Sequence, residues 1–448
     1  MASFLIVFFF RVVHFDLKGA PPKLFYFEQV LRCIQSWGVT GVLLEWEDTF
    51  PYSGNLTHLG SESNSGGDGM YTMQEVQRIL ALCNEIGLEI QLVQTMGHME
   101  FVLKHPCHEH LREYDRSPAI ICPNKKESKE LVREMVMQVL AVQPDAKYFH
   151  IGADEVCHIA HCDDCRKRVQ STYPIDLWRI YLDYIRDLVL FIRDLRPNIT
   201  ILMWDDMIRV MTPEYYKPDL VVWNYDTRDT FGFPPAMWPM YRMHFPAVWA
   251  GSAFKGANGS SQMISPVSRY VNNQVAWVDE IRVAGAQVRF VGVVFTGWSR
   301  YDHFATLCEL LPTSLNSLAN CVKCFAVGTL FECVAKYIAP LRSAHITPTR
   351  RQLHSDSTPF QLRRSVPRST LHRRQLDSVS TPFQLRRSVL GTLRHCVGRR
   401  VDYSSTVSRQ RNVDALVSKR NGYGRTGLLS ISSKFNLTFK DIRLIIEC

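Results

Sequence analysis

The chain has 448 residues, 46% of them hydrophobic, so it can bury one large core and also carry an appendage. Its net charge of +9 is unevenly placed: residues 341–448 hold 21 Lys and Arg against 6 Asp and Glu, whereas the first 340 residues carry more acids than bases. Thirteen cysteines in a chain this long exclude a small disulfide-stapled scaffold, and the sequence predicts no membrane-spanning segment.

The chain opens with an apolar stretch, residues 1–11, whose role the sequence leaves open. This stretch lacks the basic start of a secretory signal, and a strand-like segment follows at once without a convincing small-residue cleavage site. We therefore expect no cleaved secretory signal.

Eight short apolar segments then recur along the chain, and most of them end in polar or acidic residues. Most are continuous runs of Val, Ile, Leu and Phe, the pattern of strands that are covered on both faces in a parallel sheet. The segments are residues 12–19, 41–48, 88–98, 148–155, 199–206, 220–226, 247–254 and 291–298.

Helical patterns fill several of the gaps between these segments. Residues 72–87 give the clearest one, in which Thr72 and Glu75 form a capping box and Gly87 offers a left-handed stop. Residues 175–197 and 266–285 predict two more helices, and residues 212–220 a short one. The alternation favours an α/β fold, a (β/α)8 TIM barrel over residues 12–330, with an open doubly wound sheet as the alternative. The barrel is favoured because polar and aromatic residues end nearly every strand, and all strand ends of a barrel converge on one mouth.

Two adjacent acids, Asp154 and Glu155, follow the small residues Gly152 and Ala153 at the end of the fourth predicted strand. Neighbouring side chains on a regular strand point to opposite faces, so both acids can serve one ligand only where the backbone turns. Glycosidic cleavage needs a proton donor and a negative partner for a cationic centre, which gives such a pair a chemical purpose. A dry, aromatic pocket would raise the pKa of the acid that donates the proton.

Other polar and aromatic residues also fall at or near the predicted strand ends. Indole rings suit the apolar faces of a sugar, and polar groups there could bind its hydroxyls, although about half of the polar ones should be structural. The candidates for substrate binding are Asp16, His98, Trp204, Trp223, Tyr225, Trp249, Trp298, Tyr301 and Asp302, and Glu45 and Asp205 share this placement.

"HIGADE", residues 150–155, resembles the His/Asn-x-Gly-Gly/Ala-Asp-Glu signature of glycoside hydrolase family 20, the β-N-acetylhexosaminidases. "VHFDLKGAPPK", "LVQTMGHMEFVLKH" and "WAGSAFKGA" are similar to the hexosaminidase D branch, and the similarity runs from about residue 12 to about residue 324. The resemblance implies exo-acting removal of terminal N-acetylgalactosamine or N-acetylglucosamine with retention, through an oxazolinium ion and without a cofactor. Asp154 would orient the acetamide, Glu155 would be the acid and base, and Tyr225 or Tyr301 would hold the acetamide oxygen. It also implies a cytoplasmic or nuclear location and a glycan or glycoconjugate as substrate.

Two features stand outside this interpretation. In "CHIAHCDDC", Cys162 and Cys165 have the spacing of a zinc knuckle, but one knuckle without a distant partner does not predict a metal site. The basic tail, residues 341–448, contains "STPFQLRRSV" twice, 23 residues apart, and its composition predicts disorder, with nucleic-acid binding as the less favoured alternative. The sequence leaves the oligomeric state open.

Overall fold

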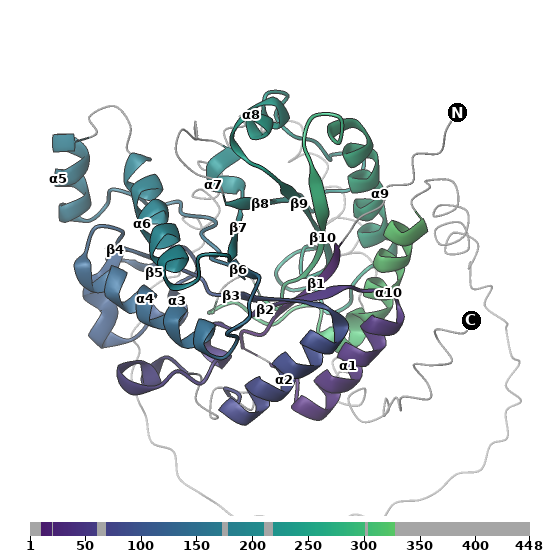
Figure 1. Cartoon of the computed structure of the whole chain (residues 1–448), viewed down its shortest axis with the longest axis horizontal. Coiled ribbons are helices and arrows are strands. Elements are labelled where there is room, and N and C mark those ends of the chain that lie inside the picture. The colour runs from purple at the N-terminus through teal and green to yellow at the C-terminus, as the bar shows by residue number, and fades with distance from the viewer. Residues whose placement is uncertain are drawn as a thin grey trace, which may run out of the picture. The chain divides into compact units, whose positions relative to one another are not determined.

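The eight predicted strands form a closed parallel barrel in a computed structural model of the chain (Figure 1). The structure describes residues 10–19, 21–60, 69–172, 178–209, 218–300 and 303–327. Around the barrel the strand order is β1-β10-β9-β8-β7-β6-β3-β2, which confirms the (β/α)8 prediction. The barrel strands are β1 (Phe10–Asp16), β2 (Gly41–Glu45), β3 (Leu88–Leu92), β6 (Tyr148–His150), β7 (Thr200–Trp204), β8 (Asp219–Trp223), β9 (Val248–Lys255) and β10 (Phe290–Gly297).

Helices follow the strands and cover the outside of the barrel (Figure 1). In α2 the predicted capping box is present: the Thr72 side chain accepts from the backbone of Glu75, and the Glu75 side chain accepts from the backbone of Thr72. Gly87 ends this helix at a φ of 142°, which a side chain would strain. The α-helices are α1 (Leu24–Ser36), α2 (Met73–Ile86), α3 (Glu100–Leu103), α4 (Lys126–Ala141), α5 (Asp163–Thr172), α6 (Arg179–Leu195), α7 (Asp206–Arg209), α8 (Met237–His244), α9 (Val267–Ala284) and α10 (Leu311–Val327). Short 3-10 turns span Glu47–Thr49, Gly54–Leu59 and Pro106–Leu111.

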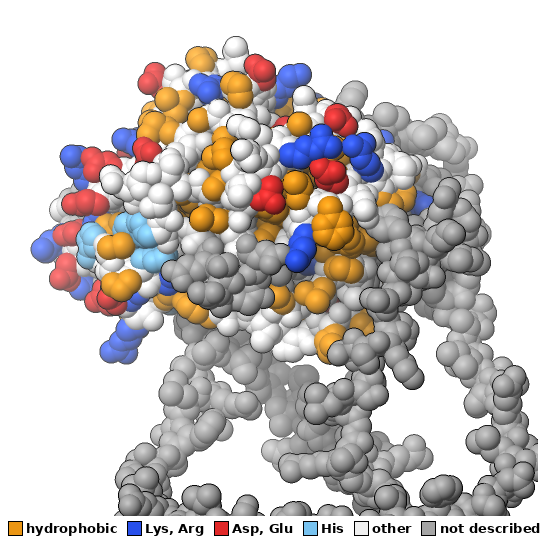
Figure 2. All heavy atoms as spheres, turned by 90° about the horizontal axis from the view of Figure 1, so that it is seen from below, with side chains coloured by type: hydrophobic (Ala, Val, Ile, Leu, Met, Phe, Trp, Pro, Cys, Tyr) orange, Lys and Arg blue, Asp and Glu red, His pale blue; other side chains and the backbone are white. Residues whose placement is uncertain are grey.

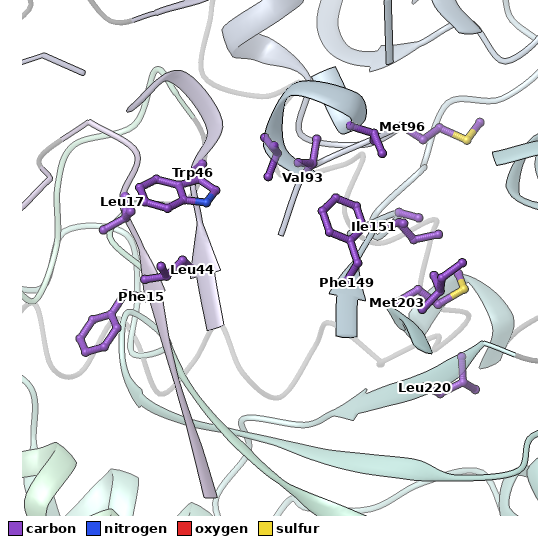
Figure 3. Close-up of a cluster of buried hydrophobic side chains, with 14 of the residues drawn as sticks. Phe15, Leu17, Leu44, Trp46, Val93, Met96, Phe149, Ile151, Met203 and Leu220 are labelled. Carbon is purple, nitrogen blue, oxygen red and sulfur yellow. The ribbon is translucent and has the colours of Figure 1, made fainter. Parts of the chain in front are cut away.

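Both faces of the barrel strands are buried, as their continuous apolar runs predict. One face packs inside the barrel, where Leu43, Leu202 and Val294 belong to a common cluster. The other face packs against the helices, and Phe15, Leu44 and Phe149 belong to this larger outer cluster (Figure 3). Alternate residues of each strand therefore serve the two cores, and a strand's last inward residue faces the mouth of the barrel.

The structure differs from the predictions in three places. Strand β1 begins at Phe10, so the last two residues of the 1–11 stretch are part of the barrel. A small antiparallel hairpin, β4 (Arg112–Tyr114) with β5 (Ser117–Ile121), lies in the long connection between β3 and β6, and the apolar pattern did not predict it. Asp219 and Leu220, the last two residues of the predicted 212–220 helix, are instead the first two residues of strand β8.

Several predictions fall on parts of the chain that the structure does not describe. These are the first nine residues, residues 212–217 of the short helical candidate, and the whole basic tail. Within the described ranges, none of the helices combines the length and the apolar composition that crossing a bilayer requires.

Candidate active site

The two adjacent acids lie just past the end of β6, which ends at His150. Gly152, Ala153 and Glu155 all have positive φ values, of 63°, 67° and 49°. Non-glycine residues adopt this left-handed conformation at a cost, because Cβ approaches a carbonyl oxygen. The backbone therefore turns here, and the side chains of Asp154 and Glu155 line the same cavity instead of opposite faces of a strand.

Neighbouring elements hold this turn in place. The hydroxyl of Tyr181, on α6, donates to the carbonyl oxygen of Ala153 at 2.8 Å. On the other side the loop after β3 comes so close that a Cβ at Gly97 would lie 2.1 Å from the carbonyl oxygen of Asp154. Only glycine fits there, and this packing offsets the strain of the left-handed residues.

The acids open into a cavity of about 260 Å³ at the carboxyl ends of the barrel strands. Active sites of (β/α)8 barrels form at this end, where loops from many strands meet. Seven of the eleven predicted site residues line the cavity: His98, Asp154, Glu155, Trp204, Trp223, Tyr225 and Trp298. Lys18, Gly256, Ala257, Gly259 and Arg300 complete the lining, and the sequence pattern had singled out none of these five.

His98 joins the two acids electrostatically. Its Nε2 lies 3.4 Å from Asp154 Oδ2 and 3.4 Å from Glu155 Oε2. Burial lowers the pKa of His98, but the charges and hydrogen bonds of the two acids outweigh burial and hold the pKa well above its usual value. Burial raises the pKa of Glu155, but the hydrogen bond and charge of His98 reverse this effect and leave the pKa below its usual value. In the free site the pKa of Glu155 is therefore lowered and not raised as expected, because the His98 cation lies beside it.

Replacing His98 by Asn is expected to lower the melting temperature most between about pH 4.3 and pH 6.5, the ordinary values of Glu and His. Asn tolerates the φ of 53° at this position and carries no charge. The raised pKa of His98 stabilises the fold fully below the unfolded value and loses this effect as pH rises through the folded pKa. The lowered pKa of Glu155 stabilises the fold above its unfolded value and loses this effect as pH falls through the folded pKa. Melting curves of both proteins across the pH range measure the difference, and a difference that does not vary with pH would contradict the ion-pair assignment.

Aromatic rings form the walls of the cavity. The rings of Trp204 and Trp298 lie 5.7 Å apart, and Trp223 stacks on Tyr225 with ring centroids 5.1 Å apart. The indole of Trp298 donates to the hydroxyl of Tyr225 at 3.1 Å. Burial raises the pKa of Tyr225, so its hydroxyl stays neutral and can donate its own proton to a ligand. The walls therefore combine apolar ring faces with one phenol aimed by an indole.

Asp206 is a functional candidate that the sequence analysis passed over. Its Oδ2 accepts from the backbone N–H of Glu155 at 2.9 Å, and its Oδ1 accepts from the indole of Trp223 at 3.3 Å. Burial, followed by the charge of Asp154, raises the pKa of Asp206 to about 8. The neighbouring Asp205 instead binds Arg209 at 2.6 Å and is fully buried, so it is structural. The sequence feature that could have identified Asp206 is its position in "WDD", where it is the second of two acids at the end of a predicted strand.

A buried lysine, Lys18, lines the cavity where the sequence analysis expected Asp16. Lys18 Nζ lies 2.8 Å from Asp16 Oδ2, 3.4 Å from Glu47 Oε1 and 3.9 Å from Glu45 Oε1. Burial lowers the pKa of Lys18, but these carboxylates outweigh it and hold the pKa well above its usual value. The ammonium group lies 5.3 Å from the ring centroid of Trp298 and faces the cavity. Of these two residues, Lys18 lines the cavity and Asp16 does not.

The other predicted site residues lie elsewhere. Asp16 is 5% exposed and accepts from the backbone N–H of Ser299 at 2.7 Å, which is a structural role. Trp249 is fully buried inside the barrel, stacked on Phe10 with centroids 5.5 Å apart, and it does not line the cavity. Tyr301 and Asp302 lie outside the described residues.

Metal-binding atoms come together in three groups among the described residues. The groups are Asp16, Glu45 and Glu47; His58, Cys107 and His108; and Glu113, Cys122, Cys162 and Cys165. In the first group, Lys18 Nζ already supplies the positive charge that the carboxylates of Asp16 and Glu47 need.

Comparisons with known proteins agree with this geometry. Residues 45–231 match the model of "Glycosyl hydrolase family 20, catalytic domain". Human Hexosaminidase D is 38% identical over 333 residues, which cover 72% of this chain and 66% of the human protein. Bovine Hexosaminidase D is 38% identical over 335 residues, which cover 72% of this chain and 93% of the bovine protein. The crystal structure of a β-N-acetylhexosaminidase from Bacteroides fragilis shares the fold, with a TM-score of 0.53, 16% identity, and coverage of 70% of this chain and 65% of that one.

A closed (β/α)8 barrel whose mouth presents paired carboxyl groups among tryptophans is the arrangement of a glycoside hydrolase. The family follows from the matches: the chain belongs to glycosyl hydrolase family 20, and its human and bovine relatives are named Hexosaminidase D. The chain spans just under two thirds of the human relative it matches.

Proposed function

We propose that this protein is an exo-acting, retaining β-N-acetylhexosaminidase that removes terminal β-linked N-acetylgalactosamine or N-acetylglucosamine from glycans or glycoconjugates. The observation that carries the proposal is the turn after β6, which brings Asp154 and Glu155 to one aromatic cavity. The names of the human and bovine relatives support the same activity.

Asp154 suits the role of orienting the substrate's acetamide group. Its Oδ1 is buried and has no hydrogen-bond partner among the described residues, whereas Oδ2 faces His98. A buried carboxylate oxygen without a donor is costly, and an amide N–H of the sugar would satisfy it. Tyr225 can donate to the acetamide oxygen from the stacked aromatic wall. Together they would aim that oxygen at the anomeric carbon.

The reaction then needs two steps and one exchangeable proton. The acetamide oxygen attacks the anomeric carbon, the glycosidic C–O bond breaks, and Glu155 gives its proton to the leaving oxygen. Asp154 stabilises the resulting oxazolinium ion by its negative charge. Glu155 then takes a proton from water, whose oxygen attacks the same carbon and opens the ring. Two displacements at one carbon retain its configuration.

The lowered pKa of Glu155 belongs to the free site, in which His98 contacts both acids. A sugar in the cavity displaces water from the exposed side of Glu155, which is 38% exposed. This added burial acts in the direction that raises the pKa of a carboxyl group. Substrate binding therefore favours the protonated acid that the first step uses.

The test compares nitrophenyl β-N-acetylgalactosaminide and β-N-acetylglucosaminide with the matching β-galactoside and β-glucoside. The plain sugars lack the internal nucleophile, so we expect their kcat/KM to be lower by at least about 10³-fold. Proton NMR during hydrolysis should show the β-anomer of the free sugar first. Comparable cleavage of the plain sugars, or the α-anomer first, would contradict the mechanism. Sugar binding without turnover would indicate a binding barrel instead.

A further inference from the structure

The cysteine motif after the acid pair meets distant partners in the folded chain. Cys122 follows β5 directly, and Cys165 lies in the first turn of α5. Cys122 Sγ lies 3.4 Å from Cys162 Sγ and 3.5 Å from Cys165 Sγ. Glu113, in β4, brings a carboxylate oxygen within 4.8 Å of all three sulfur atoms. In Figure 1 the hairpin β4–β5 and helix α5 lie on the same side of the barrel.

Glu113 is the observation that points to a ligand. Its side chain is fully buried, and its Oε1 accepts from the backbone N–H of His161 at 2.8 Å. Its Oε2 is also buried and, among the described residues, has no hydrogen-bond partner. A buried carboxylate with a free oxygen is costly unless a cation or a donor satisfies it. The space beside it holds soft sulfur ligands.

The spacing of the sulfur atoms fits one small ion. Tetrahedral zinc binds thiolate sulfur at about 2.3 Å, which sets sulfur atoms roughly 3.7 Å apart. The distances of 3.4 Å and 3.5 Å from Cys122 are close to that value and much longer than the roughly 2.05 Å of a disulfide. The backbone N–H of Cys165 also donates to Cys162 Sγ at 3.3 Å, which favours a thiolate at Cys162.

We propose that Glu113, Cys122, Cys162 and Cys165 bind one zinc ion in a structural site. Three thiolates and one carboxylate oxygen complete four-coordination, which leaves no position for a substrate and distinguishes a structural from a catalytic site. Cys122, Cys165 and Glu113 are buried, and the half-buried Cys162 gives the ion a way in. The ion joins the hairpin β4–β5 to the start of α5 and anchors the segment that follows Glu155.

Metal content and the cobalt spectrum of the full chain test this site. Purified protein should contain about one zinc per chain by elemental analysis, as one four-ligand site predicts. Replacing zinc by Co(II) should give a thiolate-to-cobalt charge-transfer band and the intense visible bands of a tetrahedral site. Zinc below about 0.1 per chain in folded protein, a stoichiometric content of another metal, or an octahedral cobalt spectrum would overturn the proposal. None of these readouts depends on catalysis.

A second group of potential metal ligands, which is rich in histidine, has to be distinguished from the proposed zinc site. His58 Nε2 lies 2.7 Å from His108 Nε2 and 3.6 Å from the sulfur of the exposed Cys107. Figure 2 shows histidine side chains gathered at one edge of the face it draws. Cys107→Ser is therefore a control that should leave the zinc content and the charge-transfer band unchanged. The half-buried Cys33→Ser, on α1, is a second control.

Single substitutions in the cluster should remove or weaken the metal. Cys162→Ser should lose the stoichiometric zinc, and Glu113→Gln should weaken zinc binding by removing a charged ligand while keeping an acceptor for the backbone N–H of His161. Where a cysteine variant does not fold, the zinc affinity of Glu113→Gln and the cobalt spectrum of the unchanged protein still test the proposed zinc site. Peptide mapping without reductant gives a further check, since a disulfide between Cys122 and Cys162 in the isolated protein would overturn the zinc assignment.

Discussion

Glu155→Gln is expected to lower kcat/KM by about 10²–10⁴-fold, the range for loss of a positioned general acid and base. The amide cannot give or take the proton, but its oxygen still accepts from His98, which lies 3.4 Å from the carboxylate oxygen. Folding should be preserved for the same reason. Nitrophenyl N-acetylhexosaminides with a series of ring substituents measure the effect.

The dependence on the leaving group separates an acid from a structural role. A leaving group of low pKa needs little protonation, so the loss should be smallest for the most acidic phenol and largest for an alkyl glycoside. The exposed Glu85→Gln is a matched control that should match the unchanged protein. Near-normal turnover of the alkyl glycoside by Glu155→Gln would refute the assignment of the proton donor.

The barrel could be predicted because each strand carries its own local signal. Continuous apolar runs mark strands covered on both faces, and the capping box at Thr72 with Glu75 marks a helix start without any tertiary information. The acid pair could also be placed, since it directly follows the fourth barrel strand. The turn that aims both acids is different, because it depends on the packing of Gly97 and Tyr181 from distant elements.

Depth along a strand decided which tryptophans line the cavity, and the apolar pattern does not give depth. Trp204 is the last residue of β7 and lines the cavity. Trp249 is the second residue of β9, which continues to Lys255. Six residues at about 3.3 Å each place Trp249 roughly 20 Å below the end of its strand. In the sequence Trp204 is followed by two aspartates, whereas Trp249 is followed by Ala250 and Gly251, and the length of β9 in the structure shows how deep Trp249 lies.

Contacts between charged residues that lie far apart in the sequence could not be predicted either. Lys18 is held by Glu45 and Glu47 from the next strand and its loop, and Asp206 binds the backbone of Glu155 across 51 positions. The zinc knuckle looked isolated because its partners, Cys122 and Glu113, lie about 40 or more positions earlier, on a hairpin that no apolar pattern marked. Such groups have no local spacing, and only the fold brings them together.

Asp154→Asn is expected to lower kcat/KM for N-acetylhexosaminides by about 10²–10³-fold, the usual loss when a group that stabilises transition-state charge is removed. The neutral amide can still fill the space beside His98, so the change removes charge and little volume. The positive charge of the oxazolinium ion then lacks its buried negative partner. The exposed Asp145→Asn is the control for the substitution itself.

A thiazoline analogue of the bicyclic intermediate tests whether Asp154 acts on that ion or only on the shape of the site. Its ring nitrogen can carry the positive charge that Asp154 would stabilise, so its affinity for Asp154→Asn should fall by a factor close to the loss in kcat/KM. The affinity for free N-acetylhexosamine, which carries no charge, should fall much less. If both affinities fall equally, Asp154 binds the sugar without favouring the charged intermediate. Unchanged thiazoline affinity would exclude Asp154 from the charge-stabilising role, because removal of its negative charge would then have no effect on binding of the cation.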